Sequence, residues 1–489
     1  FGKTAEAQRD SRFAFGKPYT LLLLIVLFGL FLRLLFFSGM GISDSLVYSK
    51  TANDINAGKG IDPNSTLTLS TRLGLIYPTA LSYRLFGIND FSSVIFVLIT
   101  SIASIILIFY FGKLLFNEKI GLMAAFLMSF FPLDVVHATK LGSDLPSAFF
   151  MAFGVYVFLY SEKKNKIGYG GYYFLSGLLI GIGYLIRESA LLIALFFVAY
   201  IAYKKKFKKE YFLVPLGVLM IFAIESFVFF SLTGDPIYRV VSSQQYSAKA
   251  VIEHNYFGRL IFPTGLLHYP WLFLTNNLLA PFYIFVFISF LYSLVQKKKE
   301  ASIILLWFIP LILYLSFGSA SLTQYIPFRA VDRYTSIVTI PAILLMSFLL
   351  SEKKPMIKKL APFFLILLLL ISVVTVYLRE DRNLLASLRQ VYPELKNLDK
   401  TAYTDSRSIQ ALNYISGFKN LLDLKEFQEN FDAIEDSYVM INRRMIRNLK
   451  EANKNLKFPE EIENIPKEWK TIKEIGNNEN DKIVIYKIP

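Results

Sequence analysis

The chain has 489 residues, of which 54% are hydrophobic, 16% aromatic and only 18% charged, and its mean hydropathy is +0.46. Soluble domains carry about 25% charged residues, so this composition excludes an ordinary soluble enzyme and a disordered chain. The net charge of +15 could indicate a nucleic-acid binder, but residues 379–489 contain 19 basic and 19 acidic residues. The whole excess lies in residues 1–378, where it is typical of basic membrane loops.

Eleven apolar segments are candidates for transmembrane helices, because a bilayer core of about 30 Å needs roughly 20 apolar residues per helix. They lie at about 19–38, 91–112, 119–132, 145–160, 172–186, 189–203, 211–233, 271–295, 301–317, 335–351 and 360–378. We therefore expect an all-α polytopic membrane bundle of about 11 transmembrane helices. No small-residue cleavage site follows the first segment, so we interpret it as an uncleaved signal anchor.

Basic loops predict the orientation of the bundle. The N-terminal tail and the loops at 113–119, 161–167, 204–210, 296–300 and 352–359 together contain 21 Lys and Arg against 7 Asp and Glu. Such loops stay in the cytoplasm, so the N-terminus is expected there, and an odd number of spans places the C-terminal part outside. We predict a multi-pass protein of the cytoplasmic membrane with a transmembrane domain, 1–378, and an extracytoplasmic domain, 379–489.

Two long loops and the C-terminal part lie on the predicted outer side. In the first loop, from about 39 to 90, DSLVYSKTANDINAGKG and TRLGLIYPTALSYRLFG each predict an amphipathic helix at the membrane interface. The C-terminal part alternates between strand-like and helix-like stretches: TAYTD, SRSIQALNYIS, DSYVMIN, MIRNLKEANKNL and KIVIYKI. This alternation predicts a small α/β domain, whose basic clusters we interpret as a solvated face. We expect the domain to act as a cap or to dock the acceptor.

Ionisable residues collect at the predicted outer ends of the helices. They are Asp44, then Asp134, His137, Lys140 and Asp144, then Arg187 and Glu188, and finally Arg329, Asp332 and Arg333. Ionisable groups at membrane depth are costly and usually functional. Carboxylates beside guanidinium groups indicate proton transfer next to an anionic ligand, and the Arg fork suits phosphate.

Five stretches, in this order, resemble the glycosyltransferase C superfamily. They are DSLVYSKTANDINAGKG, RLGLIYPTALSYRLFGINDFS, HATKLGSDLPSAFF, GLLIGIGYLIRES and RAVDRYTSIVTIPAI. The similar families are the protein O-mannosyltransferases and the lipid A aminoarabinose transferases, which use a dolichyl- or undecaprenyl-phosphate sugar. The resemblance covers residues 19–350 and implies a membrane glycosyltransferase that moves a hexose or pentose to an acceptor hydroxyl on the extracytoplasmic face.

The resemblance also implies roles for the polar residues. Asp44 matches the family's base, which takes the proton of the acceptor hydroxyl, and Asp144 is the second catalytic candidate. The leaving phosphate gathers negative charge, so cations must hold it. The candidates for this are Arg72, Arg187, Arg333 and Lys140, and the candidates for positioning the substrate are Tyr48, Glu188 and His137.

Structural roles compete with several of these assignments. Asp44 could instead cap the helix at 45–58 or pair with Arg33, and Asp144 could cap the fourth span. Arg187 could pair with Glu188, and Arg333 with Asp332. Glu225 lies inside the seventh span, where an unpaired charge is costly, so it could be protonated, pair with a neighbour or line the cavity.

The expected partners are a polyprenyl-phosphate-sugar lipid, the membrane and an acceptor that is a protein, a lipid or a glycan, with no nucleic acid. With no cysteine and three histidines, a carboxylate-bound Mg²⁺ or Mn²⁺ is more plausible than zinc, and whether a metal binds stays open. A non-catalytic lipid-linked-sugar-binding subunit is one alternative, since Ser45 stands where the family has a second acid. A flippase is the other, although we find no internal repeat of the transporter kind.

Overall fold

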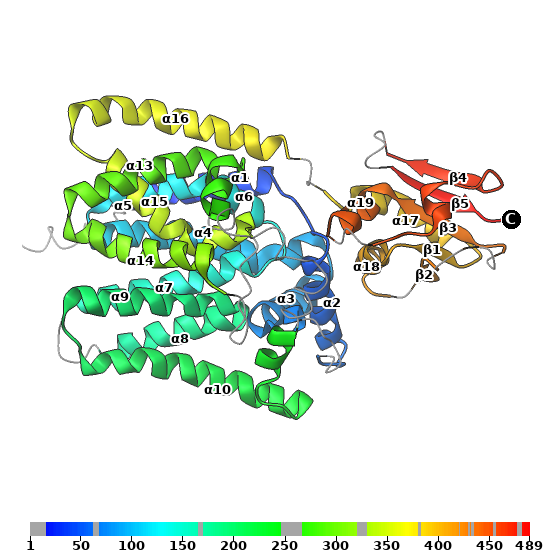
Figure 1. Ribbon diagram of the computed structural model, residues 1–489, viewed down its shortest axis with the longest axis horizontal. Coiled ribbons are helices and arrows are strands. Elements are labelled where there is room, and N and C mark those ends of the chain that lie inside the picture. The colour runs from blue at the N-terminus through cyan, green and yellow to red at the C-terminus, as the bar shows by residue number, and fades with distance from the viewer. Residues whose placement is uncertain are drawn as a thin grey trace, which may run out of the picture.

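The computed structural model describes residues 16–61, 68–164, 170–245, 267–319, 330–379, 383–419, 421–428, 431, 435–452, 456–476 and 482–489. Long helices run side by side in the first part of the chain, and a small α/β domain follows at one end of them (Figure 1). The main helices are α1 (Lys17–Leu35), α2 (Asp44–Asn56), α3 (Leu73–Phe86), α4 (Asp90–Leu115), α5 (Glu118–Ser129), α6 (Pro132–His137), α7 (Asp144–Lys164), α8 (Gly170–Ile186), α9 (Ala194–Lys204), α10 (Leu213–Thr233), α12 (His268–Thr275), α13 (Ala280–Gln296), α14 (Lys299–Phe317), α15 (Ser336–Leu350) and α16 (Pro355–Tyr377). Short 3-10 helices are η1 (Thr68–Thr71), η2 (Glu188–Ile193), η3 (Lys209–Phe212) and η6 (Asp332–Thr335).

Within the described residues, seven helices are long and apolar enough to cross a membrane: α1, α4, α7, α10 with η3, α14, α15 with η6, and α16. An eighth span results if α12 and α13, which meet at 119°, are taken together. The predicted number of 11 is not confirmed. The segments at 119–132, 172–186 and 189–203 form shorter helices, because α5 ends before Pro132 and α9 begins only after a 3-10 turn.

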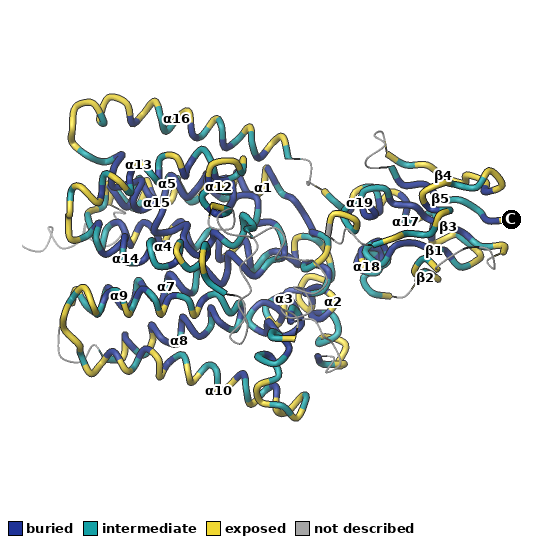
Figure 2. Tube along the Cα trace, in the orientation of Figure 1, coloured by how far each residue is buried: buried dark blue, intermediate teal, exposed yellow. Residues whose placement is uncertain are grey.

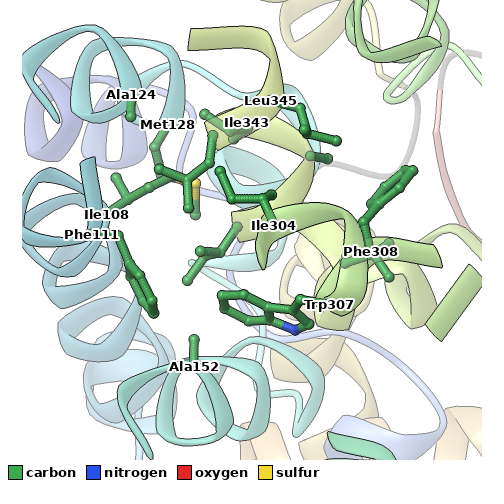
Figure 3. Packing of buried hydrophobic residues seen from close by; sticks show 14 of the residues in the cluster. Ile108, Phe111, Ala124, Met128, Ala152, Ile304, Trp307, Phe308, Ile343 and Leu345 are labelled. Atoms are coloured by element: carbon green, nitrogen blue, oxygen red, sulfur yellow. The ribbon is translucent and has the colours of Figure 1, made fainter. Parts of the chain in front are cut away.

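The core of the bundle is apolar and surrounds α15, all of whose residues are buried. Figure 3 shows Trp307 and Ile304 of α14 packed among Ile108 and Phe111 of α4, Ala152 of α7, and Ile343 of α15. On the outside of the bundle, α10 and α16 present long exposed stretches (Figure 2), where apolar side chains such as Phe227 and Phe363 are more than half exposed. An apolar exterior around an apolar core is typical of a helix bundle that lies in lipid.

The C-terminal domain contains α17 (Ala386–Lys396), α18 (Ser406–Ile415), α19 (Arg443–Ala452), α20 (Glu460–Glu463) and a five-stranded sheet. The strands are β1 (Ala402–Thr404), β2 (Leu424–Glu426), β3 (Tyr438–Asn442), β4 (Lys470–Ile475) and β5 (Ile483–Lys487), in the order β2-β1-β3-β5-β4. β1 pairs in parallel with β2 and β3, while β5 is antiparallel to β3 and β4. The five elements predicted for this region fold as β1, α18, β3, α19 and β5.

Polar and apolar contacts join the C-terminal domain to the bundle. Arg389 of α17 makes a bidentate ion pair with Asp90 at the start of α4, with N–O distances of 2.6 and 2.9 Å. Tyr414 of α18 also donates to Asp90, at 2.9 Å. Apolar residues of α2, α3, α17 and α18 share one buried cluster. The domain is therefore held over the end of the bundle where α2 lies (Figure 1).

Candidate active site

Asp44 begins α2, directly after a turn in which Ser43 adopts a left-handed backbone with φ of 65°. Its carboxylate neither caps α2 nor pairs with Arg33; Arg333 of η6 donates to Oδ2 at 2.7 Å instead. The side chain is 25% exposed. Burial alone would raise the pKa of Asp44, but the nearby guanidinium groups, that of Arg333 first, lower it below the ordinary value. Asp44 is thus a carboxylate that pairs with a cation and that a ligand can reach.

Asp144 begins α7, a hundred residues later, and shares this cation with Asp44. Nε of Arg333 lies 3.8 Å from Oδ2 of Asp144, and Arg187, at the end of α8, donates to Oδ1. The guanidinium carbon of Arg187 lies over the aromatic ring of Tyr334, 4.4 Å from the ring centroid. Arg187 therefore pairs with Asp144 and not with its neighbour Glu188. Two carboxylates and two guanidinium groups from four separate elements meet at one point.

A second polar cluster lies behind these residues, around Arg72. Arg72 precedes α3 and donates to the hydroxyls of Tyr48 and Ser143, the latter at 2.9 Å, and its Nη2 lies 3.5 Å from Glu188. Gly74 makes this approach possible, because a Cβ there would lie 2.9 Å from the backbone nitrogen of Ile186. The start of α3 therefore touches the end of α8, and Arg72 reaches the turn that holds Glu188.

Arg239 is a functional candidate that we did not predict from the sequence. It donates to Glu188 at 2.8 and 2.9 Å and to Glu225 of α10 at 2.6 Å, and it is buried. Burial would raise the pKa of Glu188, but Arg239 and then Arg72 lower it to about 2. A carboxylate inside an apolar helix requires a nearby cation, so Glu225 was the signal from which Arg239 could have been found.

His137 and Lys140 lie near the same carboxylates, at the end of α6 and in the loop that leads to α7. His137 ends α6, and its Nε2 lies 3.9 Å from Asp332 of η6. Asp332 also accepts a hydrogen bond from the backbone nitrogen of Arg333 at 2.7 Å. The guanidinium of Arg333 contacts Asp44 and Asp144. Asp134, three residues before His137, is different: it accepts from Arg33 and Ser101 in a fully buried ion pair. Asp134 therefore stabilises α6 against α1 and α4.

A cavity of about 580 Å³ adjoins Asp44, Asp144 and Arg333, while Arg72 and Arg187 lie behind its wall. It is lined by Gly41, Ile42, Asp44, Ser45, Val97, His137, Lys140, Leu141, Gly142, Asp144, Leu145, Arg333, Leu384, Arg444, Arg447, Asn448 and Glu451. Its volume is within the usual range for a small-molecule site. The last four residues belong to α19 of the C-terminal domain, so two arginines of the basic clusters that we interpreted as a solvated face, Arg444 and Arg447, line the cavity, while Lys450 is exposed. Arg329 lies outside the described residues.

The cavity has cationic groups that can bind an anion and carboxylates that can accept a proton. Its carboxylates are in contact with guanidinium groups, and the described residues contain no cluster of three or more His, Asp or Glu that could hold a metal ion. Because both carboxylates already contact guanidinium groups, the donor set around Asp44 and Asp144 does not fit a divalent cation. What the arrangement provides is an ionised carboxylate, Asp44, beside guanidinium groups whose geometry suits an anion such as phosphate.

Comparisons with known proteins concern the fold. Residues 73–230 match the model of the dolichyl-phosphate-mannose-protein mannosyltransferase family. Among curated proteins, no sequence matches the chain. The structure is similar to that of ArnT from Cupriavidus metallidurans in the apo state, with a TM-score of 0.61, 11% identity and coverage of 96% of this chain and 98% of ArnT.

Two ligand-bound structures are also similar. ArnT bound to undecaprenyl phosphate matches with a TM-score of 0.58, 10% identity and coverage of 96% of this chain and 98% of ArnT. The oligosaccharyltransferase AglB from Archaeoglobus fulgidus, in complex with an inhibitory peptide and a dolichol-phosphate, matches with a TM-score of 0.55, 12% identity and coverage of 88% and 70%. The predicted resemblance to the glycosyltransferase C superfamily is confirmed, and the fold is of that type.

Proposed function

We propose that this chain is a membrane glycosyltransferase that moves a hexose or pentose from a polyprenyl-phosphate donor to an acceptor hydroxyl. The family match and the fold support the class of enzyme. The observation on which the proposal rests most is the position of Arg333. It lies between Asp44 and Asp144 in a cavity that also has Lys140 on its wall, with Arg187 directly behind.

The reaction that we propose uses these groups in separate roles. The phosphate of the donor binds to Arg333 and Arg187, which neutralise the charge that develops as the sugar leaves. Because Arg333 also holds Asp44, its engagement with phosphate weakens that ion pair and makes Asp44 more basic. Asp44 then accepts the proton of the attacking hydroxyl, and the sugar carbon exchanges its bond to phosphate oxygen for one to the acceptor oxygen.

The remaining residues position these groups. Arg239 holds Glu188, and Glu188 pairs with Arg72 behind the cavity. Arg72 in turn fixes Tyr48 and Ser143 beside Asp44 and Asp144. Lys140 and His137 lie where the donor phosphate or the sugar would pass. We propose these as positioning residues, since none of them bridges the two acids as Arg333 does.

We further propose that the reaction takes place on the extracytoplasmic side. The loops 204–210, 296–300 and 352–359, which are rich in lysine, lie at the end of the bundle opposite to the C-terminal domain (Figure 1). Basic loops favour the cytoplasm, so the cavity and residues 379–489 would face outward, and residues 1–378 would form the unit in the cytoplasmic membrane.

Turnover by the purified full-length chain tests the proposal. The chain is reconstituted in lipid nanodiscs with dolichyl- and undecaprenyl-phosphate hexoses and pentoses, and released polyprenyl phosphate is measured by mass spectrometry. We expect release with at least one donor. If polyprenyl phosphate binds but none of the donors is turned over with any acceptor class, the chain is a binding subunit and the proposal is wrong.

A further inference from the structure

One face of α19 in the C-terminal domain points into the cavity. Arg444, Arg447, Asn448 and Glu451 all line it, and their spacing of i, i+3, i+4 and i+7 places them on a single side of the helix. The other sides of α19 have different surroundings, since Met445 and Ile446 are buried in the domain. Lys450 makes an exposed ion pair with Glu463 at 2.6 Å. The direction of Arg444 and Arg447 is therefore fixed by the packing of the helix.

The two arginines lie on a different wall of the cavity from the guanidinium groups of the bundle. On the side of the bundle, Arg72, Arg187, Arg239 and Arg333 are accompanied by four carboxylates: Asp44, Asp144, Glu188 and Glu225. On the wall formed by α19, two arginines face the cavity with one carboxylate, that of Glu451. The cavity therefore has basic residues on two walls, Arg333 and Lys140 on the side of the bundle and Arg444 and Arg447 on the side of α19.

The topology of the sheet places α19 where α/β domains bind ligands. β1 has β2 on one side and β3 on the other, all three parallel, and α18 and α19 begin directly after β1 and β3. The space beyond the carboxyl ends of such strands, where the strand order reverses, is the usual ligand site of open parallel sheets. Asn442 ties the two helices together here, because it accepts from the backbone of Met445 and donates to Ser408, both at 3.2 Å.

We propose that Arg444 and Arg447 form an anion-binding subsite that holds a phosphate or carboxylate group of the acceptor beside the hydroxyl that receives the sugar. This rests on the proposed transferase function. The donor's lipid tail must come from the membrane, so its phosphate meets Arg333 and Arg187 on the bundle side. The acceptor then has the opposite wall, where two arginine forks suit an anion and Asn448 suits a neighbouring hydroxyl.

Binding measurements on the full-length chain in nanodiscs test the subsite. The probes are glucose 6-phosphate and glucuronate as anionic saccharides, glucose as the neutral control, and undecaprenyl phosphate and dolichyl phosphate for the donor side. The variants are Arg444→Gln, Arg447→Gln and the double change. Arg443→Gln is the matched control, because Arg443 lies on the same helix but does not line the cavity.

We expect each cavity-facing variant to lower the affinity for glucose 6-phosphate and for glucuronate about tenfold or more, the effect of losing a hydrogen bond to a charged group. Binding of undecaprenyl phosphate should stay within about twofold, which also shows that the variants are folded, and the Arg443→Gln control should bind every probe normally. Equal affinity for glucose and glucose 6-phosphate overturns the subsite. So does displacement of glucose 6-phosphate by undecaprenyl phosphate. Failure of both undecaprenyl phosphate and dolichyl phosphate to bind the unmodified chain would instead overturn the proposed transferase function.

Discussion

Replacing Asp44 by asparagine should stop sugar transfer while the protein stays folded and keeps its donor site. The change keeps the shape of the side chain and removes the charge that Arg333 contacts at 2.7 Å. Since the pair is partly exposed, its loss should cost no more than about 1 kcal/mol of stability. Arg333 keeps Asp144 as a neighbour, and the cavity becomes more positive, so the donor phosphate should bind at least as well as before.

The magnitude of the effect follows from the role of a general base, which contributes about 10² to 10⁴ in rate. This corresponds to about 2.7 to 5.4 kcal/mol of activation free energy, at 1.36 kcal/mol for each factor of ten. The assay is the initial rate of polyprenyl phosphate release at saturating donor and acceptor. We expect Asp44→Asn to lower kcat at least a hundredfold with no increase in the KM of the donor.

Asp54→Asn is the matched control, because Asp54 lies on the same helix and makes only an exposed pair with Lys50 at 2.6 Å. This variant should retain activity within about twofold. If Asp44→Asn keeps more than a tenth of the rate, Asp44 is not the base. If both variants lose activity alike, the loss reports damage to α2 and the reasoning fails.

Three further variants separate the roles of the charged residues. Arg333→Gln removes the main cation that lowers the pKa of Asp44, so that pKa rises and the acid limb of the pH–rate profile moves to higher pH; an unmoved limb contradicts the assignment. Arg187→Gln should raise the KM of the donor about tenfold or more, as measured in the same release assay, and an unchanged KM would remove Arg187 from the phosphate site. Asp134→Asn leaves the buried charge of Arg33 without its partner and should destabilise the fold by about 3 to 5 kcal/mol, visible as a lower Tm, while donor binding at low temperature is retained.

The sequence predicted the kind of fold well where its pattern was local. Long apolar runs gave the spans of α1, α4, α10 and α16, and the alternating tail gave β1, α18, β3, α19 and β5. The predicted number of spans is not confirmed, because the apolar content of 119–132 and 189–203 does not reveal where Pro132 or a 3-10 turn interrupts a helix. The short strands β2 and β4 were missed, since β2 has three residues and every residue of β4 but the last is exposed.

The candidate site could be predicted residue by residue but not pair by pair. The structure brings Asp44, Asp144, Arg187 and Arg333 together, as their common place at the predicted outer ends of the helices indicated, and their roles stay predictions. The pairs proposed from neighbours in sequence were wrong, because Arg187 contacts Asp144 and not Glu188. Pairing across the bundle depends on which helix ends meet, and a single sequence does not contain that information.

Long-range packing also explains the two features that sequence reasoning missed. Arg239 follows α10 and looks like one more charge of an outer loop, until its contacts with Glu188 and Glu225 are seen. The basic residues of α19 have the composition of a solvated face, and only the docking of the C-terminal domain through Asp90 turns Arg444 and Arg447 into the cavity. The spacing of i, i+3, i+4 and i+7 identifies the residues that share one side of α19, but it does not show what that side contacts.

The most direct test of the account is a cryo-electron-microscopy map of the full-length chain in nanodiscs with undecaprenyl phosphate. The account predicts that the phosphate lies in the cavity between the bundle and the C-terminal domain, within hydrogen-bonding distance of Arg333 or Arg187, with Asp44 released from its ion pair. A phosphate at the lysine-rich end of the bundle, or one in the cavity that leaves the contact between Arg333 and Asp44 intact, would contradict it.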